Sequence, residues 1–79
     1  MNSARKIDIR HLRYFIAATE HGSFRKAGGA LSIQESAISR RIRDMEDLLG
    51  ASLFQRHSGG VVLTLAGQRF LRRARTALQ

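Results

Sequence analysis

Apolar residues recur with the period of an α-helix in three stretches before residue 50. The first predicted helix runs from Asp8 to about His21 and ends at Gly22, because glycine accepts the positive φ found at helix C-termini. Its apolar face is formed by Leu12, Phe15, Ile16 and the methyl group of Thr19. A second, short helix follows Ser23, whose hydroxyl is a typical N-cap. Its apolar positions are Phe24, Ala27, Ala30 and Leu31.

The second predicted helix contains Gly28 and Gly29, each of which costs about 1 kcal/mol relative to alanine in a helix interior. We expect close approach to a neighbouring helix to compensate, since a residue without a side chain permits it. Residues 32–34 form a turn, and a third helix is predicted from about Glu35 to Leu49, with Gly50 as its stop. Its buried stripe is predicted to comprise Ile38, Ile42, Met45 and Leu49. The opposite face carries Ser36, Arg40, Arg43 and Asp47.

From Leu53 the pattern changes to a short apolar pair, a glycine-rich turn and a β-branched run that ends at Thr64. This order predicts a β-hairpin in which Gly59 and Gly60 supply the positive φ of the turn. Because a two-stranded hairpin is marginally stable alone, it must pack on the helices. Thr64 is placed to cap a last helix. The apolar side of that helix comprises Phe70, Leu71, Ala74 and Leu78, and its remaining surface carries Arg69, Arg72, Arg73 and Arg75.

Length and charge narrow the possible functions. A chain of 79 residues supports one small core. Its 14 basic and 6 acidic residues give a net charge of +8, which favours a polyanionic partner, either nucleic acid or an anionic membrane surface. No acidic residue follows Asp47. The sequence has no cysteine, no secretory signal and no apolar run long enough to span a bilayer, so we expect a cytoplasmic protein.

Metal and enzyme chemistry find little support in the sequence. The three histidines, His11, His21 and His57, lack a paired spacing, so we interpret them as ordinary surface or half-buried side chains and predict no metal or other cofactor. The chain shows no nucleophile elbow, no phosphate-binding glycine loop after a strand and no carboxylate pair in apolar surroundings. We therefore expect a binding protein and not an enzyme.

The second and third predicted helices, with the turn between them, form a candidate helix-turn-helix at residues 23–42. In such a motif one face of the recognition helix packs against the helix before it, while the opposite face enters the DNA major groove. The side chains that contact bases are expected near the start of that helix: Gln34, Glu35, Ser36, Ser39 and Arg40. Serine, glutamine and arginine can bind base edges, and arginine can bind phosphate instead. Glu35 can equally act at the helix N-terminus by complementing the helix dipole.

The acids later in the third helix, Asp44, Glu46 and Asp47, would repel phosphate, so this helix is expected to enter the groove by its N-terminal end. Alternatively they form solvated pairs with Arg40, Arg41 or Arg43. Arg56, on the predicted hairpin, either reaches phosphate or the minor groove or is an exposed side chain without a partner. The arginines of the last helix either face phosphate or form a solvated surface. The complete predicted DNA-contacting set is Ser23, Arg25, Gln34, Glu35, Ser36, Ser39, Arg40, Arg43 and Arg56.

Three segments together resemble the N-terminal DNA-binding domain of LysR-type bacterial transcriptional regulators: LRYFIAATEHGSF (Leu12–Phe24), SAISRRIRDMEDLLGASLFQRH (Ser36–His57) and LTLAG (Leu63–Gly67). The resemblance covers about Ile7 to Gly67 and implies a mainly α-helical, winged helix-turn-helix fold. It implies a DNA-binding domain at residues 7–64 with its wing at 53–63, and a truncated linker and dimerisation helix at 65–79. The residues that would pair two subunits are Phe70, Leu71, Ala74 and Leu78.

The same resemblance implies a homodimer that binds a dyad-symmetric site on double-stranded DNA. It also implies a small-molecule effector that acts only through a domain absent from this chain. Family members commonly have Ser-Gln-Pro where this chain has Gln34, Glu35 and Ser36, so their base preference does not transfer. Two other classes remain as alternatives: a non-specific DNA- or RNA-binding protein, although interleaved aromatic residues are lacking, and a membrane-surface peptide formed by the helix after Thr64.

Overall fold

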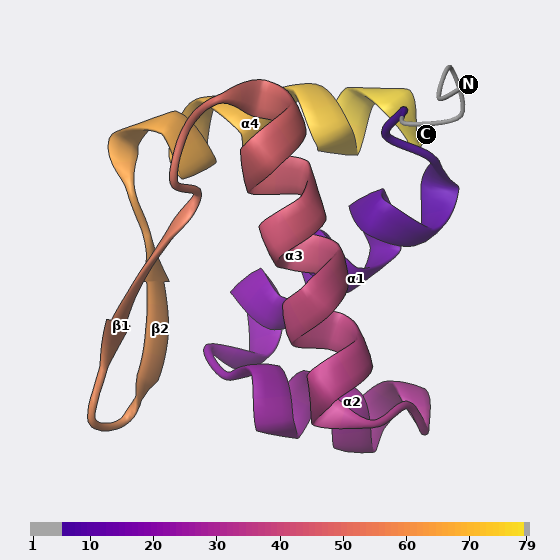
Figure 1. Cartoon of the computed structure of the whole chain (residues 1–79), viewed down its shortest axis with the longest axis vertical. Helices are drawn as coiled ribbons and strands as arrows, with labels where there is room; N and C mark the ends of the chain where they lie inside the picture. The colour runs from indigo at the N-terminus through magenta and orange to yellow at the C-terminus, as the bar shows by residue number, and fades with distance from the viewer. Residues whose placement is uncertain (1–5, 79) are drawn as a thin grey trace.

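The computed structural model describes residues 6–78 and has a mainly α-helical architecture with one β-hairpin (Figure 1). The elements are α1 (Ile9–His21), α2 (Phe24–Leu31), α3 (Glu35–Leu49), β1 (Phe54–His57), β2 (Gly60–Leu63) and α4 (Leu65–Ala77). In Figure 1, α4 lies across the top of the molecule, and the hairpin descends beside α3. The predicted mainly α-helical, winged helix-turn-helix fold is confirmed, with element limits within a residue or two of those expected from sequence. Within the described residues, no helix is long and apolar enough to cross a membrane.

The core lies where α1, α3, the hairpin and α4 meet. Its largest fully buried side chains are Phe15, Ile38, Met45 and Leu53. Phe15 is central, since its ring centroid lies 5.3 Å from that of Phe54 and 5.2 Å from that of Phe70. Burying a side chain of this size contributes roughly 1.5–3 kcal/mol. Residues far apart in the sequence therefore stabilise one another through a single aromatic cluster.

Two predicted apolar faces are shorter than expected. Leu49 is 41% exposed because it lies at the last turn of α3, beside an open groove shared with α4. In α2, Ala30 and Leu31 are exposed as well, because they belong to the last turn before the chain leaves the helix at Ser32, which has a φ of 59°. The buried stripe of α3 is therefore Ile38, Ile42 and Met45.

The glycines divide into those that the packing requires and those that it does not. A Cβ on Gly28 would lie 2.5 Å from the carbonyl oxygen of Ile33, whereas a Cβ on Gly29 would meet nothing within 4 Å. The prediction that close packing requires a glycine is thus correct for Gly28, although the neighbouring segment is the turn before α3 and not a helix. For Gly29 the prediction is wrong. In the hairpin, Gly60 has a positive φ of 142° and Gly59 does not, so the predicted pair of positive φ values is also wrong.

The hairpin packs on the helices through backbone contacts. Its strands are antiparallel, with Phe54 opposite Leu63 and His57 opposite Gly60. The N–H of Val61 donates a hydrogen bond to the carbonyl oxygen of Gly22 at 2.9 Å. A Cβ on Gly60 would overlap that same carbonyl oxygen. Gly60 therefore permits the hairpin to lie against the turn between α1 and α2. The hairpin needs such packing because two strands alone are only marginally stable.

Candidate nucleic-acid interface

The helix-turn-helix is held by local caps and one tight turn. The Oγ atom of Ser23 accepts a hydrogen bond from the backbone N–H of Lys26 at 3.1 Å, so this predicted DNA-contacting residue acts as the N-cap of α2. After Ser32, the backbone N–H of Ile33 donates to the carbonyl oxygen of Gly28 at 2.9 Å. This bond fixes the start of α3 close to the end of α2. Gln34 is the N-cap residue of α3 and makes no side-chain capping bond, which leaves its amide group available.

The two faces of α3 differ as the sequence predicted. Ile38 and Met45 are fully buried, whereas the predicted DNA-contacting side chains at Gln34, Glu35, Ser36, Arg40 and Arg43 are exposed, and Ser39 is half-buried. Arg40 and Arg43 lie on different flanks of this outer face. Arg40 lines a shallow hollow with Ala37, Arg41 and Asp44. Arg43 lines a groove between α3 and the hairpin, together with Ser39 and Arg56.

Arg56 joins the hairpin to α3. One Nη atom of its guanidinium donates a hydrogen bond to Oγ of Ser39 at 3.4 Å. Its Cζ atom lies 4.9 Å from the centre of the Phe24 ring, which is the geometry of a cation–π contact. Arg56 is exposed, but the interpretation that it has no partner is therefore wrong. The contact with Phe24 was not predicted, and no local sequence signal links two residues so far apart.

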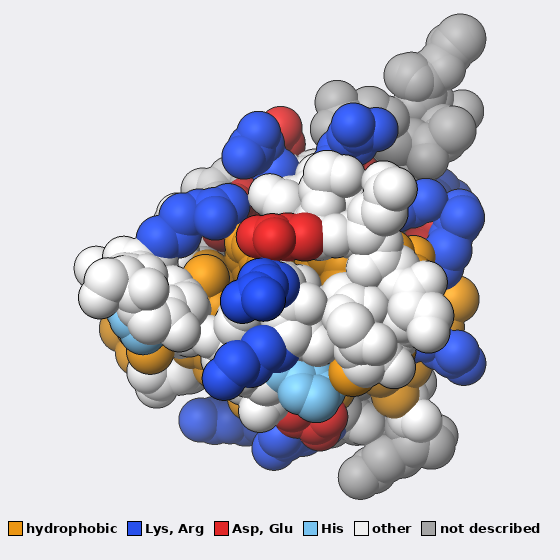
Figure 2. All heavy atoms as spheres, turned by 90° about the horizontal axis from the view of Figure 1, so that it is seen from below, with side chains coloured by type: hydrophobic (Ala, Val, Ile, Leu, Met, Phe, Trp, Pro, Cys, Tyr) orange, Lys and Arg blue, Asp and Glu red, His pale blue; other side chains and the backbone are white. Residues whose placement is uncertain are grey.

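A second hollow, of about 340 Å³, lies between the start of α2 and the hairpin. Its lining includes the predicted residues Ser23, Arg25, Glu35 and Arg56, together with His57 and Lys26. Lys26 was not among the residues predicted from sequence. Its signal was present, because it is a basic residue directly after Arg25 in the helix-turn-helix. Figure 2 views the molecule from the end at which the hairpin turn and the start of α3 lie, and basic side chains stand out along this end with a few acidic ones between them.

Two of the acidic residues of α3, Asp44 and Glu46, have partners outside this helix. Oε2 of Glu46 accepts hydrogen bonds from the backbone N–H groups of Leu53 at 2.8 Å and Phe54 at 3.4 Å. Asp44 contacts the imidazole of His11 on α1. Both carboxylates therefore connect α3 to other parts of the fold, a role that neither sequence interpretation anticipated.

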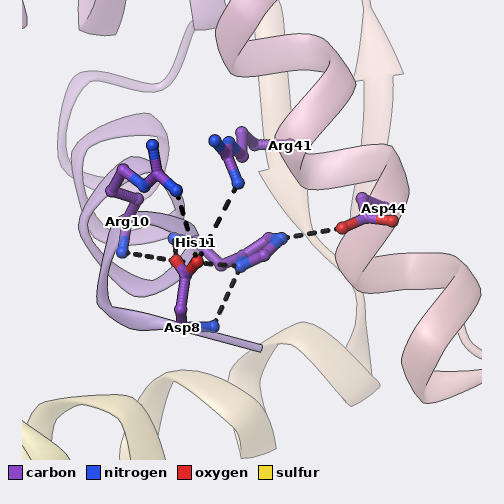
Figure 3. A network of polar contacts seen from close by, with 5 residues as sticks. All are labelled: Asp8, Arg10, His11, Arg41 and Asp44. Carbon is purple, nitrogen blue, oxygen red and sulfur yellow. Dashed lines mark hydrogen bonds and ion pairs between the residues drawn. The ribbon is translucent and has the colours of Figure 1, made fainter. Parts of the chain in front are cut away.

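His11 is 2% exposed, so its interpretation as a surface or half-buried histidine is wrong (Figure 3). Its Nδ1 atom lies 3.0 Å from the backbone N–H of Asp8, and its Nε2 atom lies 2.8 Å from Oδ2 of Asp44. Because a backbone N–H can only donate, Nδ1 accepts and Nε2 donates its hydrogen to Asp44 in the neutral ring. The imidazole thereby ties the start of α1 to the middle of α3. Within residues 6–78 no group of three potential metal-binding side chains occurs.

Asp8 completes this network. Its Oδ1 atom accepts hydrogen bonds from the backbone N–H groups of Arg10 at 2.9 Å and His11 at 3.3 Å, and its Oδ2 atom lies 4.0 Å from Arg41. Burial alone would raise the pKa of Asp8, but these backbone hydrogen bonds and the electrostatic attraction of the His11 and Arg10 side chains outweigh it, and the pKa is lowered. The carboxylate is thus favoured at the N-terminus of α1.

The predicted dimerisation residues on α4 have different environments. Ala74 is 2% exposed, and Phe70 packs edge-on against Phe15 inside the same subunit. Leu71 is half-buried against the core, and Leu78 is 36% exposed. Much of the apolar side of α4 is therefore covered by the domain itself, and Leu78 offers the most exposed apolar surface of the four.

A trihelical core with a projecting helix and a hairpin beside it defines this chain as a winged helix-turn-helix domain. Comparison with known proteins identifies the family: residues 9–68 match the bacterial regulatory helix-turn-helix proteins of the lysR family, and the chain belongs to that family. Its relatives include the HTH-type transcriptional regulator ClcR of Pseudomonas putida, 44% identical over 72 residues. The uncharacterized HTH-type transcriptional regulator YnfL of Escherichia coli (strain K12) is 40% identical over 72 residues. Each alignment covers 91% of this chain and 24% of the relative.

Solved structures agree with this assignment. The DNA-binding domain of CbnR in complex with DNA superposes with a TM-score of 0.88 at 38% identity, covering 91% of this chain and 83% of the other. The DNA-binding domain of BenM bound to catB site 1 DNA gives 0.87 at 40% identity, covering 91% and 81%. The chain thus spans about a quarter of the length of its curated relatives and most of the length of these isolated domains.

Proposed function

We propose that this chain binds double-stranded DNA with sequence preference, as the DNA-binding domain of a LysR-type transcriptional regulator. The observation that carries the proposal is the asymmetry of α3, whose Ile38 side is fully buried while the polar side chains from Gln34 to Arg40 project from its N-terminal end. Such a helix can place its first turns in the major groove. The DNA complexes of the CbnR and BenM domains support the proposal.

The proposed contacts divide by chemistry. Gln34, Ser36 and Arg40 can hydrogen-bond with base edges, and Arg25, Arg43 and Arg56 carry the positive charge that phosphates or a narrow groove attract. Ser39 contributes through its contact with Arg56. Ser23 acts mainly as the N-cap of α2. Glu35 acts mainly as a negative charge in the first turn of α3, where it complements the helix dipole. No reacting group or cofactor is required for this activity.

The proposed active form is a homodimer formed through residues 65–79, the predicted dimerisation segment, which contains α4. Leu78 and the exposed edge of Leu71 would lie in the contact, and Phe70 and Ala74 would support the helix from beneath. Two subunits would place two α3 helices in successive major grooves, about 34 Å apart, on a dyad-symmetric site. We place the regulator in the cytoplasm, and we expect a small-molecule effector to act through a domain other than this one.

Selection of bound sites from a random pool of duplex DNA tests the proposal, because it reports half-site sequence, spacing and symmetry together. Arg40→Ala should weaken binding to the selected duplex by about ten- to a hundredfold, as expected for a lost base contact of about 1–3 kcal/mol. Arg13→Ala, which removes the same charge from an exposed position of α1 outside the proposed DNA-contacting and dimerisation residues, is the matched control and should change affinity much less. Equal affinity for every duplex sequence, or for duplex RNA, would refute sequence-specific DNA binding.

A further inference from the structure

The side chain of Arg56 lies over the ring of Phe24. The ring of Phe24 is itself fixed, because this residue is 5% exposed and its ring meets that of Phe54 edge-on, with centroids 5.5 Å apart and an interplanar angle of 89°. One face of this fixed ring lies under the Arg56 guanidinium, with Cζ 4.9 Å from the ring centre. The ring therefore defines where the cation lies.

Ser39 provides a second, directional contact with the same guanidinium. Nη2 of Arg56 donates to Oγ of Ser39 at 3.4 Å. An arginine has five N–H donors, so this bond leaves donors free, and the Arg56 residue as a whole remains exposed. The guanidinium can consequently keep both contacts while its outer edge meets a phosphate or a base.

Without these contacts, a hairpin arginine would have considerable freedom. A long side chain loses up to about 2 kcal/mol of conformational freedom when it is ordered, and Arg43 lines the same groove and repels it by like charge. Part of that cost is met in the free protein when the guanidinium is held over the Phe24 ring. This is how preorganisation raises affinity without a new contact to the ligand.

We propose that Phe24, a buried residue, is a positioning residue for DNA binding. It holds Arg56 against α3, so that the hairpin and the recognition helix meet DNA as one surface. The inference rests on the proposed function, and it adds a residue outside the predicted DNA-contacting set. It also distinguishes two roles for the hairpin arginine: a freely mobile arm, or a fixed extension of α3.

Phe24→Leu is the direct test, since leucine keeps an apolar side chain in the core and removes the π face. Binding to the duplex selected by the wild-type chain should weaken about two- to fivefold, the equivalent of the cation–π contact at an exposed site. The same substitution in an Arg56→Ala background should leave affinity unchanged, because the residue that Phe24 positions is gone. Phe15→Leu, which alters the same aromatic cluster without touching Arg56, is the matched control for core packing.

A readout on the free protein separates positioning from general destabilisation. The Arg56 side-chain protons lie over an aromatic ring, so their NMR signals should be displaced upfield in the wild type and in Phe15→Leu, and should return toward random-coil positions in Phe24→Leu. All affinities are compared well below the melting temperature of each variant, which circular dichroism establishes.

The outcomes are distinguishable. If the wild-type chain binds all duplexes equally, the proposed function fails, and this inference fails with it. If the wild type is selective but Phe24→Leu weakens binding equally with and without Arg56, or strengthens it, the function stands and the positioning role of Phe24 is refuted. A twofold or larger loss that disappears in the Arg56→Ala background, with the NMR displacement abolished, establishes it.

Discussion

Replacing Gly67 with alanine tests how closely α4 packs against the segment that leads into the hairpin. Gly67 is buried in the first turn of α4, and a Cβ there would overlap the Leu53 carbonyl oxygen and lie 2.8 Å from Cδ2 of Leu63. The backbone N–H of Gly67 donates to Oγ1 of Thr64 at 3.0 Å, and the N–H of Thr64 donates to the same Leu53 carbonyl at 3.0 Å. Relief of the overlap therefore requires α4 and its cap to move.

The magnitude follows from opposing contributions. Alanine in place of glycine gains at most about 1 kcal/mol of helix propensity. Against this gain, overpacking costs about 1–3 kcal/mol, and displacement weakens two hydrogen bonds that contribute about 0.5–1.5 kcal/mol each. We expect Gly67→Ala to lower the free energy of unfolding by about 2–3 kcal/mol, which is a large share of the roughly 4–12 kcal/mol expected for a chain of this length. The melting temperature should fall by about 4–8 °C for each kcal/mol.

The assay is urea and thermal unfolding followed by far-ultraviolet circular dichroism. Gly29→Ala is the matched control, because a Cβ at that exposed position of α2 would meet nothing within 4 Å. The same chemical change should there increase stability by about 0.5–1 kcal/mol. If Gly67→Ala were as stabilising as Gly29→Ala, the close packing of α4 on Leu53 would be wrong.

Two further predictions concern carboxylates. Glu46→Ala should lower the free energy of unfolding by about 1–3 kcal/mol in urea titrations, since two backbone N–H groups lose their acceptor. Glu46→Gln keeps an acceptor and should lose less stability. Equal stability of the wild type and both variants would contradict the role of Glu46 as the acceptor for these two groups. Asp8→Asn keeps a capping oxygen but removes a carboxylate whose pKa is lowered from its ordinary value by hydrogen bonds from backbone N–H groups and by neighbouring side chains. A carboxylate whose pKa is lower in the folded than in the unfolded state stabilises the fold at pH values above its unfolded-state pKa, and this stabilisation is lost as the pH falls through its folded-state pKa. The stability deficit of Asp8→Asn should therefore shrink between about pH 6 and about pH 3. A deficit independent of pH would exclude a contribution from the charge.

Local rules of sequence predict the helices of this domain well because their signals lie within a few residues. Ser23 and Thr64 were expected to cap α2 and α4, and each accepts a hydrogen bond from the backbone N–H three residues later. Gly22 and Gly50 were expected to end α1 and α3, and their φ values are 67° and 68°. In each case the residue and the group that it satisfies are neighbours in the chain, so no knowledge of the tertiary fold is needed.

The errors arise where burial depends on a distant segment. The period of α3 is correct through Met45, but whether Leu49 is covered depends on where α4 lies, and the sequence does not specify this. The burial of His11 likewise depends on Asp44, which lies 33 residues away. Its isolated position in the sequence gave no sign of a partner.

The candidate interface shows the same division. Helical periodicity was sufficient to predict which side chains of α3 project, because the exposed face is the one opposite Ile38 and Ile42. It could not predict that Arg40 and Arg43 lie on different flanks or that Arg56 contacts Ser39, because the position of the hairpin relative to α3 depends on contacts between distant segments, some of which involve only the backbone. The bond between Val61 and Gly22 is one of these, and backbone groups leave no trace in side-chain patterns.

The position of α3 explains why a DNA-binding helix in so basic a chain keeps acidic residues. Asp44 ties its middle to α1 through His11, and Glu46 ties its C-terminal half to the start of the hairpin. Arg56 ties the hairpin to Ser39, nearer the N-terminal end. Lysine or arginine at the two acidic positions would add attraction for phosphate but would release α3 from both neighbours. Because affinity for a groove depends on a fixed orientation as well as on charge, we expect Asp44 and Glu46 to support DNA binding by fixing the position of α3.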